Sequence, residues 1–295
     1  MNKHMAKGIL YKITALCFAI FLLNGCASNA TKEIEVVEDD ATKVQRMEKN
    51  ANQLFDNQAY EEALIEYVNI INIDPQHEVA YMNIGRIHEY LKKYALAEVA
   101  YKQVIEINPE NTHAREGLGI SMLRQGNHAE AKRILEDLIK YHPDRWRAHN
   151  SLGVIYDLEK NHSKAIGSFT KASAINRHNP EILNNLGYSY YLSGDWEKAK
   201  KYFLQAIHVD REYKRAWSNL GLLYARNSEY KQSMTAFTNV METHEAWNQV
   251  GYLSMISGDY EASEAQLKKA ILTAPYYYED AHHNLTRLEI LKGTM

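Results

Sequence analysis

Glycine recurs along this chain at a fixed interval of 34 residues, and this periodicity constrains the fold more than any other feature of the sequence. The interval holds over four consecutive steps and shortens to 30 residues at the fifth. In the same phase, Ala or Ser stands 12 residues after each glycine, and an aromatic residue or Leu stands 16 residues after it. A fixed period of this length indicates a repeat architecture, in which each unit buries its apolar face against its neighbours. The glycines are Gly85, Gly119, Gly153, Gly187, Gly221 and Gly251.

These columns resemble the tetratricopeptide repeat, a pair of antiparallel helices with a 34-residue period. Small residues at positions 8 and 20 of a unit let its two helices approach closely, and large residues at positions 7 and 24 fill the space around that contact. Only 5 Pro and 14 Gly occur among the 295 residues, which agrees with a helical chain. The expected units are 44–77, 78–111, 112–145, 146–179, 180–213, 214–243 and 244–277, of which the sixth is four residues short.

We therefore predict an all-α fold: a right-handed superhelical solenoid of about seven helix pairs over residues 44–277. A capping helix is expected over residues 278–295, because a repeat stack needs a polar face at its end. The short sixth unit lacks about one helical turn, so its second helix is expected to be shorter than the others.

The first 25 residues have the organisation of a secretory signal peptide. Three Lys precede the apolar stretch 13–23, which is shorter than the roughly 20 residues that span a bilayer. Leu23-Asn24-Gly25-Cys26 resembles the lipobox of bacterial lipoproteins, and the resemblance implies cleavage before Cys26 and its modification with acyl chains such as palmitate. An ordinary secretory leader with an incidental Cys is the alternative.

Residues 26–43 are predicted to form a lipidated Cys followed by an acidic, flexible tether. No Asp follows Cys26. In lipoproteins of the Gram-negative type this implies export to the outer membrane, with the chain on the periplasmic face.

The charge and the motifs argue against several classes of function. The net charge of −3 gives no basic excess for nucleic acid. His-Glu pairs at 77–78, 88–89 and 244–245 open like a zinc-protease motif, but the second His four residues later is missing in each. The neighbouring His282 and His283 are interpreted as surface residues. We therefore expect no enzyme, no metal and no cofactor; an enzyme with an unfamiliar site is the remaining alternative.

The first helix of each unit is expected to line a groove that binds protein partners. Asn side chains recur at positions 5 and 6, where an amide can both donate to and accept from a peptide backbone, and Tyr recurs at positions 9 and 12. Few Lys or Arg occupy these positions, which argues against capture of a terminal carboxylate. The alternatives are that these amides are structural, or that the opposite face binds. The candidate groove residues are Asn83, Arg86, Asn150, Asp157, Asn184, Asn185, Tyr188, Asn219, Asn248 and Tyr252.

Three segments also resemble a narrower family. Residues 148–154 (AHNSLGV), 183–190 (LNNLGYSY) and 246–253 (AWNQVGYL) are similar to the TadD family, outer-membrane lipoproteins of the Tad (Flp) pilus assembly system. The resemblance is best over residues 140–260. It implies a non-enzymatic accessory factor that helps the pilus secretin or its partners to assemble. The alternative is a general periplasmic scaffold or adaptor lipoprotein, pilotin-like or serving cell-wall hydrolases.

Overall fold

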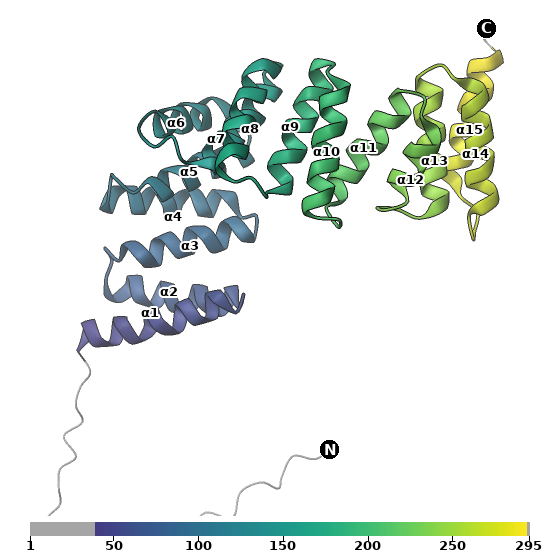
Figure 1. Ribbon diagram of the computed structural model, residues 1–295. Helices are drawn as coiled ribbons and strands as arrows, with labels where there is room; N and C mark the ends of the chain where they lie inside the picture. The colour runs from purple at the N-terminus through teal and green to yellow at the C-terminus, as the bar shows by residue number, and fades with distance from the viewer. Residues whose placement is uncertain (1–38, 294–295) are drawn as a thin grey trace, which may run out of the picture. The chain divides into compact units, whose positions relative to one another are not determined.

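Residues 39–293 are described by the computed structural model, and in this range every regular element is an α-helix (Figure 1). The predicted signal peptide, Cys26 and most of the predicted tether lie outside the described residues. The predicted all-α repeat fold, with seven helix pairs and a last helix, is confirmed. The helices are α1 (Asp40–Asp56), α2 (Tyr60–Ile73), α3 (Glu78–Tyr90), α4 (Tyr94–Ile107), α5 (Thr112–Arg124), α6 (His128–Tyr141), α7 (Trp146–Leu158), α8 (His162–Ile175), α9 (Pro180–Ser193), α10 (Trp196–Val209), α11 (Lys214–Arg226), α12 (Tyr230–Phe237), α13 (Thr243–Ile256), α14 (Tyr260–Thr273) and α15 (Glu279–Gly293).

The first helix begins earlier than the sequence pattern indicates. The tether was expected to reach residue 43, whereas α1 begins at Asp40. Asp40 lies in the first turn of α1, where a negative charge interacts favourably with the helix dipole. Residues 40–43 therefore belong to the helix.

The odd-numbered helices form a continuous layer. Each helix packs against the next along the chain, and from α3 onward each odd-numbered helix also contacts the following odd-numbered one. These are the first helices of the predicted units, so the groove expected from the sequence corresponds to this layer. None of the helices within residues 39–293 combines the length and the apolar character needed to cross a bilayer.

The glycine column is explained by the packing of one large side chain. A Cβ added to Gly187 would lie 2.8 Å from Cδ1 of Phe203, and one added to Gly153 would lie 2.6 Å from Cε1 of Phe169. These rings stand at position 24 of their units and are fully buried. The predicted close contact is confirmed in the six pairs that carry the glycine, where the position-24 side chain fills the space that the missing Cβ leaves.

The sixth unit differs from the others in its second helix. Helix α12 has 8 residues, whereas the second helix of every other unit has 14. This confirms the expected shortening. The chain turns after Phe237 and enters α13 through a capping box, in which Glu242 and Glu245 bond to each other's backbone N–H groups.

Candidate functional site

A cavity of about 540 Å³ lies among α3, α5 and α7, three successive members of the odd-numbered layer. Residues from the loops that precede α5 and α7 complete its wall. Three of the side chains that line it are arginines. The lining residues are Met82, Arg86, Tyr101, Asn111, His113, Glu116, Asp144, Arg145, Trp146 and Arg147.

Two of the three arginines have no carboxylate partner among residues 39–293. Arg147 pairs with Glu89, which also accepts a hydrogen bond of 2.9 Å from the hydroxyl of Tyr101. Arg86 donates to Oδ1 of Asn83 over 3.1 Å, and its guanidinium lies 4.6 Å from the ring centroid of Phe55. Arg145, like Arg86, hydrogen-bonds only to neutral groups.

The partners of Arg145 hold its guanidinium in place without neutralising it. Nη1 lies 2.9 Å from Nε2 of His113, and Nη2 donates to the hydroxyl of Thr112. Burial, and next the charge of Arg145, lower the pKa of His113. The neutral imidazole is therefore favoured, and Nε2 can accept the hydrogen bond from Arg145.

The cavity also contains one buried carboxyl group, that of Glu116, which has a hydrogen-bond partner of its own. Glu116 accepts a hydrogen bond of 3.1 Å from the backbone N–H of Ala148. Burial raises the pKa of Glu116, against the opposing effects of the charge of Arg147, of that hydrogen bond and of the charge of Arg145. Because guanidinium groups bind carboxylates through paired hydrogen bonds, the free donors of Arg86 and Arg145 suit an anionic ligand.

Asparagines predicted to line the groove hydrogen-bond to one another between successive units. Each bond joins an Nδ2 donor of one odd-numbered helix to an Oδ1 acceptor of the preceding one. The pairs are Asn83 to Asn52 (3.3 Å), Asn185 to Asn150 (3.1 Å), Asn219 to Asn184 (2.9 Å) and Asn284 to Asn248 (2.9 Å). The structure therefore gives these amides a role in joining repeats, which agrees with the structural alternative considered for them.

The other predicted groove residues also have intramolecular partners. Asp157 accepts hydrogen bonds from Ser189 and, over 2.8 Å, from His162. Tyr188 is exposed and stacks on Tyr191 with 6.1 Å between ring centroids. Tyr252 packs on the apolar cluster that α15 covers. Of the ten candidates, only Arg86 lines the cavity. Asn83 accepts a hydrogen bond from Arg86.

Sequence reasoning missed Arg145, Trp146 and Arg147. They occupy position 34 of one unit and positions 1 and 2 of the next, outside the positions 5, 6, 9 and 12 from which the groove residues were predicted. The scarcity of Lys and Arg at positions 5, 6, 9 and 12 therefore says nothing about Arg145 and Arg147, which line this cavity from other positions of the repeat. Arg147, a basic residue at position 2 of its unit, was the feature of the sequence from which this cavity could have been predicted. Within residues 39–293, no group of three His, Cys, Asp or Glu side chains could hold a metal ion.

Comparisons with known proteins identify the repeat. Residues 90–152, 180–213 and 244–277 match family models of the tetratricopeptide repeat. No curated protein sequence matches the chain.

Solved structures of low sequence identity share the fold. A tetratricopeptide repeat protein from Parabacteroides merdae is 16% identical over 83% of this chain and 98% of its own, with a TM-score of 0.58. PilF of Pseudomonas aeruginosa is 15% identical over 84% of this chain and 99% of its own, with a TM-score of 0.55. MamA of Desulfovibrio magneticus is 20% identical over 58% of this chain and 97% of its own, with a TM-score of 0.51. At these identities the likeness shows the fold alone.

Proposed function

We propose a function for this tetratricopeptide-repeat protein: it is a non-enzymatic assembly factor that binds a protein partner through an acidic segment. The segment occupies the cavity among α3, α5 and α7. The observation that carries this proposal is the pair of guanidinium groups, Arg86 and Arg145, that line one cavity without a carboxylate partner among residues 39–293.

The rest of the cavity suits a peptide. Met82 and Trp146 add apolar surface beside the arginines, and binding energy at protein interfaces concentrates in aromatic and arginine side chains. An Asp or Glu side chain, or a terminal carboxylate, would receive charge-assisted hydrogen bonds there. A partner segment with one such group next to an apolar residue fits this lining.

We propose further that the partner belongs to a Tad (Flp) type pilus, its secretin or another assembly component. Support comes from the resemblance to the TadD family over residues 140–260. The lipobox-like residues 23–26 support an outer-membrane lipoprotein that faces the periplasm. A general scaffold or adaptor lipoprotein of the envelope is the other candidate.

Peptide binding tests the cavity directly. We expect a fluorescein-labelled peptide rich in Asp and Leu to bind in low salt, and Arg86→Gln with Arg145→Gln to weaken the affinity at least tenfold. Arg177→Gln, an exposed arginine after α8, is the matched control for loss of a positive charge. Melting curves show whether each variant is folded. Unchanged affinity in the folded double variant would refute this role for the cavity.

The anchor is tested by Cys26→Ser. We expect this variant to leave the membrane fraction, because each buried CH₂ of an acyl chain contributes about 0.8 kcal/mol to membrane binding. Fractionation of cells in high salt, with the unchanged protein as reference, makes the measurement. A Ser variant that still sediments with outer membranes would show that Cys26 is not the anchor.

The cellular role is tested in the native bacterium. We expect cells that carry Arg86→Gln with Arg145→Gln, or Cys26→Ser, to make fewer assembled secretin multimers and fewer pili, at normal protein levels. Normal pili in both variants would refute the pilus role. The peptide measurement would then still decide whether the cavity binds an acidic segment of another envelope protein.

A further inference from the structure

A second hollow, of about 460 Å³, lies among α10, α11 and α12, apart from the arginine cavity. Its wall is mainly apolar and aromatic. Leu204 is 43% exposed there, and the indole of Trp217 is fixed by a hydrogen bond of 2.8 Å from Nε1 to the carbonyl oxygen of Arg211. Leu220, Tyr224, Thr235 and Ala236 also contribute.

The repeat supplies an internal comparison for this hollow. The equivalent place between the second and third units lies among α4, α5 and α6. There, repeat positions 25, 4, 19 and 22 carry charged residues, which are Lys102, Arg115, Glu130 and Arg133. Among α10, α11 and α12 the same positions carry Leu204, Trp217, Gln232 and Thr235. Uncharged residues, two of them large and apolar, thus replace charged ones at four matched positions.

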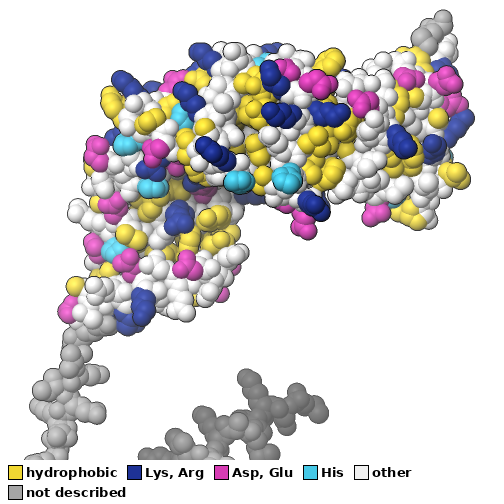
Figure 2. Space-filling model, viewed as in Figure 1, with side chains coloured by type: hydrophobic (Ala, Val, Ile, Leu, Met, Phe, Trp, Pro, Cys, Tyr) yellow, Lys and Arg dark blue, Asp and Glu magenta, His cyan; other side chains and the backbone are white. Residues whose placement is uncertain are grey.

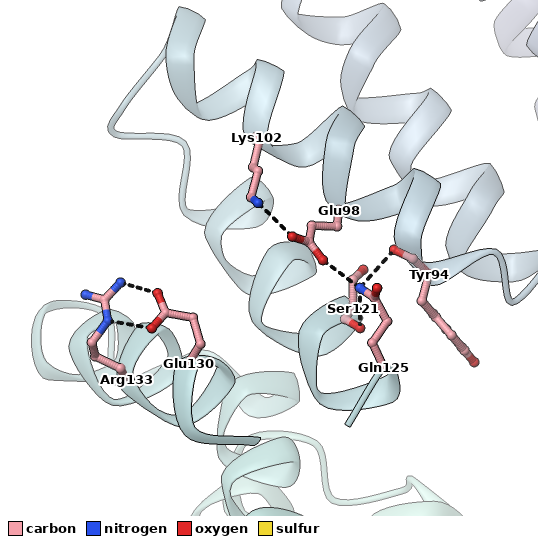
Figure 3. Close-up of polar contacts among 7 residues, drawn as sticks. All are labelled: Tyr94, Glu98, Lys102, Ser121, Gln125, Glu130 and Arg133. Atoms are coloured by element: carbon pink, nitrogen blue, oxygen red, sulfur yellow. Dashed lines mark hydrogen bonds and ion pairs between the residues drawn. The ribbon is translucent and has the colours of Figure 1, made fainter. Parts of the chain in front are cut away.

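Three of the charged residues at the matched positions among α4, α5 and α6 form ion pairs within their own helices. Nζ of Lys102 lies 2.7 Å from Oε1 of Glu98, and Nη2 of Arg133 lies 2.5 Å from Oε1 of Glu130 (Figure 3). Such side chains keep a repeat surface solvated. The loss of these charges among α10, α11 and α12 leaves apolar surface exposed, which in a soluble domain is typical of a contact site.

A small residue, Ala236, lines the hollow at a position where the preceding unit carries an aromatic ring. Position 23 of the preceding unit is Tyr202, whose ring stacks on Tyr190 with 5.5 Å between centroids. In the short unit, position 23 is Ala236, and none of the described rings stacks on Tyr224, the counterpart of Tyr190. The face of Tyr224 is instead approached by Nζ of Lys200, 4.9 Å from the ring centroid.

The edge of the hollow is positively charged. Lys231 lines it, and Lys200 lies over Tyr224. Neither ammonium group has a carboxylate partner among residues 39–293. Figure 2 shows hydrophobic side chains among Lys and Arg over α9 and α10 on the face in view. An apolar floor with a basic edge is complementary to an apolar side chain flanked by carboxylates.

We propose that this hollow is a second docking site, which takes an amphipathic helix of a protein partner with a large apolar residue between acidic ones. The apolar residue enters between Leu204 and Trp217, and its acidic neighbours lie beside Lys200 and Lys231. The aromatic wall is already ordered, so little conformational entropy is lost on binding. The protein would thus hold two partner segments at separate places along one repeat stack.

The test uses a labelled helix-forming peptide with Leu at every third and fourth position and Glu elsewhere. We expect saturable binding by fluorescence anisotropy, and at least tenfold weaker binding to Leu204→Thr. Thr stands at this repeat position in another unit, at Thr170, so this change of an exposed residue keeps the fold. Ala236→Tyr, which places a ring as Tyr202 does, is expected to block the hollow as well.

Controls separate this site from the arginine cavity and from other occupants. Arg145→Gln should leave the affinity for this peptide unchanged, and a peptide with Lys in place of Glu should bind at least tenfold more weakly. The proposal is overturned if Leu204→Thr has no effect, or if the Lys peptide binds equally well. It is also overturned if Leu204→Thr abolishes self-association in sedimentation, or binding to phosphatidylglycerol vesicles, while the Glu–Leu peptide shows no saturable binding.

Discussion

Single asparagine side chains join successive repeats of this protein. The bonds from Asn185 to Asn150 and from Asn219 to Asn184 each span 35 residues, one period plus one. Position 5 of one unit therefore meets position 6 of the next. Asn184 is only 4% exposed, so loss of its partner would leave a polar group buried without its hydrogen bond.

Removal of both amides tests this role. We expect Asn184→Ala and Asn219→Ala each to lower the free energy of unfolding by about 0.5–1.5 kcal/mol, since each breaks the same bond. The double variant should lose less than the sum of the two. Urea unfolding of the four proteins measures the coupling, with Asn69→Ala, exposed on α2, as a control. Additive effects would show that the bond contributes nothing.

Buried histidine makes stability depend on pH. His149 is buried; Nε2 lies 3.0 Å from the carbonyl oxygen of Pro143, and Nδ1 has no partner. Burial lowers the pKa of His149, and Lys171 lowers it further, against the bond to Pro143. A proton on Nδ1 would have no acceptor.

The sign of the pH effect follows from this shift. The unfolded chain binds the proton at a higher pH than the folded chain, so stability is full above about pH 6.5 and falls as the pH drops below that value. We expect His149→Gln to lose less stability than the unchanged protein between pH 7.5 and pH 5.5, measured by urea unfolding. Equal losses in the two proteins would contradict this role for His149.

At the scale of the helix pair, local sequence predicts the packing well. Gly187 and Phe203 lie in one unit, so a short repeating pattern is enough to reveal their contact. The shortening of α12 is also visible in the sequence, because four missing residues must be removed somewhere within a 34-residue unit. What the pattern does not reveal is that Lys200, and not an aromatic ring, lies over Tyr224, since that depends on which side chain fills the neighbouring space.

Two helical glycines form a matched test of the pair contact. We expect Gly187→Ala to lower the free energy of unfolding by about 1–3 kcal/mol, because its Cβ would overpack against Phe203. Gly167, in α8, has no heavy atom within 4 Å of an added Cβ, so Gly167→Ala should raise stability by up to about 1 kcal/mol. Thermal melting of both variants makes the comparison. Similar effects at the two positions would contradict the packing account.

Across the whole stack, the candidate site was harder to predict than the fold. The cavity combines Arg86 of α3 with Arg145 and Arg147 from near the start of α7, about 60 residues later in the chain. Their approach depends on how three successive units stack and on side-chain conformations that no single period encodes. The asparagines were found by their spacing, but the same spacing lets them bond to each other, so their recurrence alone could not separate binding from structure.

A stack in which each helix contacts only near neighbours should lose stability locally. Helix α15 packs on α13 and α14, and its Leu288 is fully buried with Met255 and Leu267. We expect Leu288→Ala to cost about 2–5 kcal/mol and to raise amide hydrogen exchange in α13, α14 and α15 first, leaving α3 to α7 protected. Leu272→Ala, at an 84% exposed position on α14, should change little. Because a single cooperative unit would instead lose protection evenly from α1 to α15, uniform exchange in Leu288→Ala would show that the repeats do not unfold from their ends.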